Sequence, residues 1–241
     1  MLHTTQGIVL HNIKYADKRI ISKIYTKDFG LISANVHIGN SPKSKIKSGV
    51  IQPLTQIEFV VSLKENKDIQ QISEIKCSFV YIDLQANFNK LCMAQFLNEM
   101  LYKCIKEQTP NDDLFHLICH TYQWLDKADA NYADTHIYFL MELSKHLGFY
   151  PTNNYSKQLS YFDTLEGKFG SSTKSFPLGF DNWQSGLFSE LFSHSITNQK
   201  KITRPERLAL LDCVVHYYKM QLPGLTEIKS YRVLQEMSND M

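Results

Sequence analysis

The chain has 241 residues, of which 43% are hydrophobic and 21% charged, and its formal net charge is +2. This length allows one or two domains, and the composition excludes an intrinsically disordered chain. No apolar run approaches the roughly 18 residues of a membrane span, and the N-terminus lacks the apolar stretch of a secretory signal. Five cysteines without a Cys-x-x-Cys pair favour reduced thiols in a cytoplasmic protein.

The small net charge hides an uneven distribution along the chain. Residues 1–50 carry eight basic and two acidic side chains, whereas the remainder carries 18 basic and 22 acidic ones. The eight basic residues are Lys14, Lys18, Arg19, Lys23, Lys27, Lys43, Lys45 and Lys47. This asymmetry indicates a polyanion-binding end, although lysines that merely solvate a surface would give the same count.

The first 80 residues have the pattern of a small β-barrel. Short β-branched runs separated by turn-rich pieces predict strands at 7–13, 20–26, 31–38, 50–61 and 69–77. Five short strands are typical of the OB-fold, the commonest barrel of this size that binds oligonucleotides, but SH3-like barrels share the strand count.

Two basic features within this region are candidate nucleic-acid contacts. Alternation along the second predicted strand puts Lys23, Tyr25 and Lys27 on one face, as a row of two cations around a ring. Such a row suits a single strand of nucleic acid, with ammonium groups for phosphates and a ring for base stacking. The alternative is an outer barrel face on which the tyrosine only covers the core. The second feature is the segment 42–48, whose alternating lysines predict a phosphate-binding loop.

From residue 83 onward the apolar spacing is helical. Stripes predict helices over 91–105, 114–125, 135–147, 183–192, 203–218 and 228–237. Gly148 stops the third of these, and the spacing of Thr203 and Glu206 predicts a capping box. Residues 152–180 are polar and irregular, which indicates a long loop or a small excursion from the helices.

Catalytic and cofactor motifs are scarce. His116, Cys119 and His120 share a predicted helix face, but no fourth zinc ligand is evident, and a packed or surface histidine pair is the better interpretation. Ser193 and His194 are adjacent and cannot easily act as nucleophile and base. We therefore expect no catalytic residues, no metal site and no cofactor.

The order of several short motifs resembles the RecO family of bacterial recombination mediators. In the first half these are Gly7-Ile8-Val9-Leu10, Lys14-Tyr15, Ile20 to Thr26, Phe29 to Ser33, Pro42 to Lys45, Ile51 to Leu54 and Asp68 to Glu74. In the second half they are Leu143 to Pro151 and Ile228 to Leu234. The resemblance spans most of the chain and is strongest over residues 7–77.

The resemblance implies an α+β protein with an OB-fold over residues 1–80 and an all-helical domain over 81–241. It also implies a non-enzymatic DNA repair and recombination mediator that binds single- and double-stranded DNA and anneals strands. Its partners would be RecR and the C-terminal tail of the single-strand binding protein, and it would help load recombinase, with no membrane association. Many relatives carry a four-cysteine zinc site after the Leu-Gly-Phe-x-Pro segment. Residues 152–182 contain no Cys or His here, so this insertion is expected to be a zinc-free counterpart.

Two other classes of function stay open from the residues themselves. An OB-fold module for RNA would use the same barrel with contacts to bases or 2′-hydroxyls. A non-catalytic protein-interaction scaffold would use the barrel for docking, and its lysines would only solvate the surface.

Overall fold

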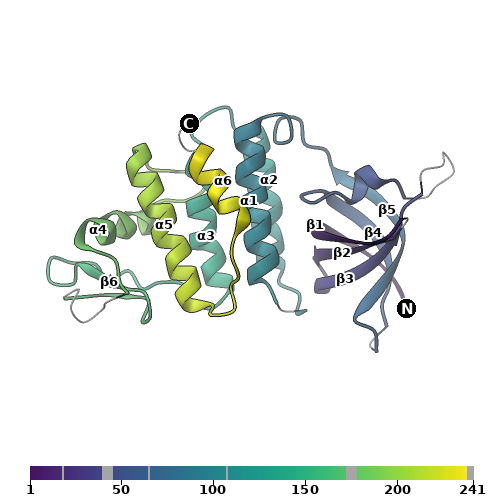
Figure 1. Ribbon diagram of the computed structural model, residues 1–241, viewed down its shortest axis with the longest axis horizontal. Coiled ribbons are helices and arrows are strands. Elements are labelled where there is room, and N and C mark those ends of the chain that lie inside the picture. The colour runs from purple at the N-terminus through teal and green to yellow at the C-terminus, as the bar shows by residue number, and fades with distance from the viewer. Residues whose placement is uncertain (18, 40–45, 65, 107, 172–177, 238–241) are drawn as a thin grey trace. The chain divides into compact units, whose positions relative to one another are not determined.

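The computed structural model describes the whole chain except residues 18, 40–45, 65, 107, 172–177 and 238–241 (Figure 1). It divides into two compact units, Met1–Lys127 and Ala128–Met241. The first unit contains a β-barrel and two helices, and the second contains the remaining helices and a short hairpin.

Five strands form the closed barrel of the first unit: β1 (Leu2–Ala16), β2 (Arg19–Thr26), β3 (Gly30–His37), β4 (Gln56–Ser62) and β5 (Ile69–Phe79). Their order around the barrel is β1-β2-β3-β5-β4, and the first half of β1 pairs with β4 to close it. All neighbours are antiparallel except β3 and β5, which pair in parallel. This is the topology of the OB-fold. The predicted fold class, an OB-fold barrel followed by a helical region, is confirmed.

The interior of the barrel is filled by the alternate, inward-pointing side chains of its strands. Ser22, Ile24 and Thr26 of β2 are all fully buried. The surrounding apolar cluster includes Val9, Ile32, Ala34, Val36, Ile57, Phe59 and Val61. One buried side chain at every second position, most of them apolar, is what a closed barrel of this size needs to fill its centre.

The fourth predicted strand begins later than the sequence pattern indicates. Residues Ser48–Ile51 form a 3₁₀ turn, η1, and β4 starts only at Gln56. Pro53 has no N–H to donate, and Leu54 has a left-handed φ of 75° that interrupts extended backbone. The apolar residues Ile51 and Leu54 are nevertheless buried, which explains why the run looked like a continuous strand.

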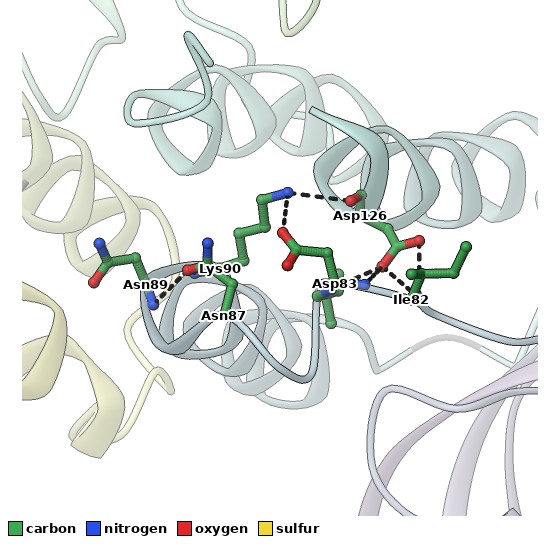
Figure 2. A network of polar contacts seen from close by, with 7 residues as sticks. Ile82, Asp83, Asn87, Asn89, Lys90 and Asp126 are labelled. Atoms are coloured by element: carbon green, nitrogen blue, oxygen red, sulfur yellow. Dashed lines mark hydrogen bonds and ion pairs between the residues drawn. The ribbon is translucent and has the colours of Figure 1, made fainter. Parts of the chain in front are cut away.

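Helices α1 (Phe88–Cys104) and α2 (Asp112–Lys127) complete the first unit, and a buried polar network fixes the chain where β5 leads into α1 (Figure 2). One carboxylate oxygen of Asp126 accepts backbone N–H bonds from Ile82, Asp83 and Leu84 at 2.7–2.9 Å. The buried Lys90 ammonium contacts the Asp83 carboxylate at 2.6 Å and the carbonyl oxygen of Asp126 at 3.1 Å. A polar network that is satisfied in this way fixes one path of the chain.

The second unit is built from α3 (Thr135–His146), β6 (Tyr161–Asp163), β7 (Lys168–Gly170), α4 (Asn182–Glu190), η3 (Leu191–Ser193), α5 (Arg204–Gln221) and α6 (Lys229–Met237). The predicted capping box at the start of α5 is confirmed, because the Glu206 carboxylate accepts the Thr203 N–H at 2.6 Å. Gly148, with a φ of +83°, follows the end of α3 as predicted.

The segment that the sequence indicates to be irregular contains the two-stranded hairpin β6–β7. Gly167 has a φ of +65° in its turn, and Asp163 Oδ1 accepts the N–H groups of Leu165 and Glu166. Phe162 on β6 is fully buried and contacts the rings of Phe169, Phe180, Phe188 and Tyr217, with centroids 4.6–5.3 Å apart. Hydrophobic ring contacts with α4 and α5 therefore hold this short hairpin.

Candidate nucleic-acid interface

The candidate interface is the outer face of β1, β2 and β3, opposite the barrel core. The strand register aligns three rows across this face. His11 lies beside Lys23 and Ser33, Ile13 lies beside Ile21 and Asn35, and Arg19 lies beside His37. We call this surface the outer face. Cations and polar groups thus alternate with aliphatic side chains across three adjacent strands.

The predicted row of Lys23, Tyr25 and Lys27 is wrong in one respect, because Tyr25 is only 1% exposed. Its backbone neighbours are Ile8 on β1 and Leu31 on β3. A ring buried to this degree cannot be the open stacking platform that the alternation predicted. Tyr25 belongs instead to the packing of the first unit.

Helix α1 covers part of the first unit's barrel next to the outer face. It packs on β1, where Asn98 Nδ2 donates to the Leu10 carbonyl at 2.6 Å and the Tyr102 ring stacks on His11 at 4.4 Å. The chain just after α1 comes within 3 Å of the position that a Cβ on Gly30 would occupy, and Gly30 has a φ of +61°. Alternation assigns a side chain to a face, but it does not show which part of that face a helix will cover.

The remaining predicted site residues differ in how exposed their side chains are. Lys14, Arg19 and Lys47 are exposed, whereas Lys23 is half-buried and its ammonium donates to Ser33 Oγ at 2.6 Å. Lys27 is half-buried beyond Tyr25, and its N–H bonds to the Gln6 carbonyl. The other three, Lys18, Lys43 and Lys45, lie outside the described residues.

An open cavity of about 750 Å³ extends from the outer face of β3 toward the β4–β5 connection. Its lining includes Leu31 and Ser33 from β3 and two lysines that the sequence interpretation missed, Lys64 and Lys67. Gln70 fastens this connection, because its amide accepts the Lys64 N–H and donates to the carbonyls of Lys64 and Lys67. One acidic residue, Asp68, also lines the cavity, and Lys23 lies beside the lining residue Ser33 in the β2–β3 pairing.

A second aromatic residue was also missed as a site residue. Tyr15 lies at an irregularity of β1, between the pairs Lys14–Ile20 and Ala16–Arg19, and is 70% exposed. The sequence feature that could have indicated an exposed ring was its position in a turn-rich piece, between Lys14 and Asp17. Sequence periodicity gave more weight to Tyr25, because Tyr25 stands in a regular strand.

Comparisons with known proteins agree with this architecture. The family model described as "Recombination protein O N terminal" matches residues 1–81, and "Recombination protein O C terminal" matches residues 85–232. The chain belongs to the RecO family. Proteins named DNA repair protein RecO from Phocaeicola vulgatus, Bacteroides fragilis and Christiangramia forsetii are 32%, 33% and 31% identical to it. Each of these alignments covers 98% of this chain and 99% of the relative.

Membership of the RecO family supports a role in DNA repair and recombination, and it confirms the resemblance found in the sequence. Neither the family descriptions nor the names of these relatives include a catalytic activity. Within the described part of the chain, no helix is long and apolar enough to span a membrane.

The histidine and cysteine candidates His116, Cys119 and His120 do not assemble into a metal site. Among the described residues, no three His, Cys, Asp or Glu side chains are grouped so that they could hold a metal ion. His116 and His120 are exposed on α2, and burial raises the pKa of the Cys119 thiol to about 12. We therefore interpret His116 and His120 as surface histidines beside a half-buried thiol.

Proposed function

We propose that the chain is a non-catalytic mediator that binds single- and double-stranded DNA, anneals complementary strands and helps load recombinase onto coated single strands. Its proposed partners are RecR and the C-terminal tail of the single-strand binding protein. The partners and the loading role rest on the RecO-family resemblance. The DNA-binding part rests on the outer face.

The observation that carries the proposal is the line of cations on an OB-fold. Lys14 and Arg19 stand at one end, Lys23 at the centre, and Lys64 and Lys67 at the far cavity. Positive side chains along an extended surface neutralise successive phosphates and release counterions, whatever the base sequence. Between them lie Ser33 and Asn35, which are short polar groups suited to phosphate or sugar contacts.

The test is the salt dependence of binding to single-stranded DNA, duplex DNA and RNA. If about five phosphates are neutralised, the log–log slope on single strands should be about −3.5. Replacing Lys14, Arg19 and Lys23 together by Gln should weaken binding to every DNA sequence and bring this slope to about −1.4.

A charge-matched control comes from the second unit. Lys157, Lys201 and Lys219 are exposed there, and their joint replacement by Gln should leave the slope closer to the wild-type value. Equal effects of the two triple variants would contradict the assignment of DNA to the outer face. Tighter binding to RNA than to DNA would favour the RNA-module alternative, and no binding to any of the three would favour a protein-interaction scaffold.

A further inference from the structure

The end of the β1–β2 hairpin forms a distinct arm. β1 pairs with β4 only over Leu2–Ile8, and from His11 onward its registered strand partner is β2. The base of the arm is held in place, because Asn12 Nδ2 donates to the Ile51 carbonyl at 2.6 Å. The stack of Tyr102 on His11 holds its other side. The arm is therefore fixed at its root.

The tip of this arm combines exposed apolar surface with positive charge. Ile13 is 45% exposed and Tyr15 is 70% exposed. Lys14 and Arg19 are exposed beside them, together with one acidic residue, Asp17. Apolar side chains flanked by cations are the combination by which proteins press against or between stacked bases while holding the adjoining phosphates.

Charge complementarity identifies the occupant of this tip as a nucleic acid, and the exposed ring indicates which part of it. Inside an intact duplex both faces of every base pair are already stacked, and inserting a side chain there costs a few kcal/mol of unstacking. The terminal base pair next to a single-stranded tail offers an open face without that cost. The outer face, which continues from Arg19 to Lys23 and the cavity beyond, would take the tail.

We propose that the β1–β2 tip binds the junction between double- and single-stranded DNA, with Tyr15 stacked on the terminal base pair and Lys14 and Arg19 on its phosphates. This inference rests on the proposed function and narrows its substrate class to a tailed duplex. Ile13 then forms the apolar side of the contact, next to its half-buried cross-strand neighbour Ile21.

The experiment compares the affinity of the full chain for a tailed duplex, for the tail alone and for the blunt duplex. The wild-type chain should prefer the tailed duplex. Tyr15→Ala should reduce that affinity by roughly 5- to 150-fold, the range found when a stacking ring is removed. Binding to the tail alone should change little, and Tyr15→Phe should retain the preference because the ring stays.

A matched control lies on the same strand. Leu2 is also 70% exposed, at the opposite end of β1, so Leu2→Ala removes a comparably exposed side chain away from the tip. It should leave all three affinities unchanged. A 2-aminopurine in the terminal base pair gives a second readout: its fluorescence should be quenched by the wild-type chain and by Tyr15→Phe, but not by Tyr15→Ala.

The outcomes separate this inference from the function on which it rests. Failure of the wild-type chain to bind any of the three DNAs would overturn the proposed function and the junction site together. Normal DNA binding with Tyr15→Ala indistinguishable from wild type would overturn the junction site alone. An equal loss of affinity for the tail and the tailed duplex would also overturn it, because the ring would then stack on single strands generally.

Discussion

At the scale of single residues, two tyrosines of the same barrel have opposite roles. Tyr25 stands in a regular strand between two lysines, yet it is only 1% exposed. Tyr15 stands at an irregular hairpin tip and is largely exposed. The difference follows from what covers each ring, since both residues belong to the same hairpin.

Tyr25→Ala should therefore destabilise the protein. Truncation of a buried large aromatic side chain removes its transfer free energy and leaves a cavity, which typically costs about 3–5 kcal/mol. Urea unfolding should show this loss, whereas Tyr15→Ala should stay within about 0.5 kcal/mol of wild type because its ring is exposed. A Tyr25→Ala protein of wild-type stability would contradict the packing described here.

Asp126 is the second residue with a specific structural role. Burial alone would raise its pKa, but the N–H bonds from Leu84, Ile82 and Asp83, together with the nearby Lys90, outweigh burial and hold the pKa below its usual range. Asp126→Ala leaves three backbone donors without their acceptor, of which only the Leu84 N–H makes a fully buried bond. An unsatisfied buried donor costs about 1–3 kcal/mol, so urea unfolding at neutral pH should show a loss of about that size. The exposed Asp129→Ala should show almost none.

The pH dependence of the Asp126 contribution follows from the direction of its pKa shift, and Asp126→Asn is the variant that tests it. A carboxyl group whose pKa is lowered by folding contributes stability above its unfolded pKa of about 4, and that contribution is lost as the pH falls through the folded value. The difference in unfolding free energy between wild type and Asp126→Asn should therefore shrink as the pH is lowered below about 4. A difference that grows on acidification would contradict the lowered pKa.

At the scale of elements, the β6–β7 hairpin occupies the segment in which many RecO-family relatives are expected to carry a zinc site. Its strands have three residues each, and a hairpin of this size is not stable by itself. The rings of Phe180, Phe188 and Tyr217 surround Phe162 and anchor the hairpin to α4 and α5. Apolar packing therefore holds the hairpin in place here without zinc ligands in residues 152–182.

Phe162→Ala should release this hairpin. The expected cost is about 3–5 kcal/mol, because a fully buried ring at the centre of the aromatic cluster is removed. Limited proteolysis should then cut between residues 152 and 182 faster than in wild type. Leu165→Ala, at the exposed turn of the same hairpin, serves as the control and should leave both stability and cleavage unchanged.

At the scale of the whole molecule, the basic residues are unevenly divided along the chain. The excess of basic residues lies within residues 1–50, inside the first unit, and the rest of the chain is slightly acidic. If the chain binds DNA as proposed, we expect the barrel to supply most of the positive charge for it. The chemistry of the second unit is dominated by aromatic packing and one buried ion pair, Arg207 with Asp134.

Metal content is a property of the whole chain that can be measured directly. We expect purified protein to contain far less than one zinc ion per chain, and EDTA to leave its thermal unfolding unchanged. Residues 152–182 contain no Cys or His, and no ligand group occurs among the described residues elsewhere. One zinc per chain by elemental analysis would contradict this and would direct attention to His116, Cys119 and His120.

The sequence by itself determined the fold class and the approximate places of the barrel strands and the helices, except for the start of β4 and the β6–β7 hairpin. Local chemistry located some of the helix ends, as at Gly148 and at the Thr203–Glu206 capping box. These features depend on interactions between residues close in the chain, so they can be read without the tertiary structure.

Only the tertiary structure decided which side chains of the candidate interface are available. Tyr25 is buried, and Lys64 and Lys67 come beside β3 through the parallel pairing of β3 with β5. The β6–β7 hairpin likewise depends on rings from helices later in the chain. Burial and proximity arise from contacts between residues far apart in sequence, and periodicity within one segment carries no information about them.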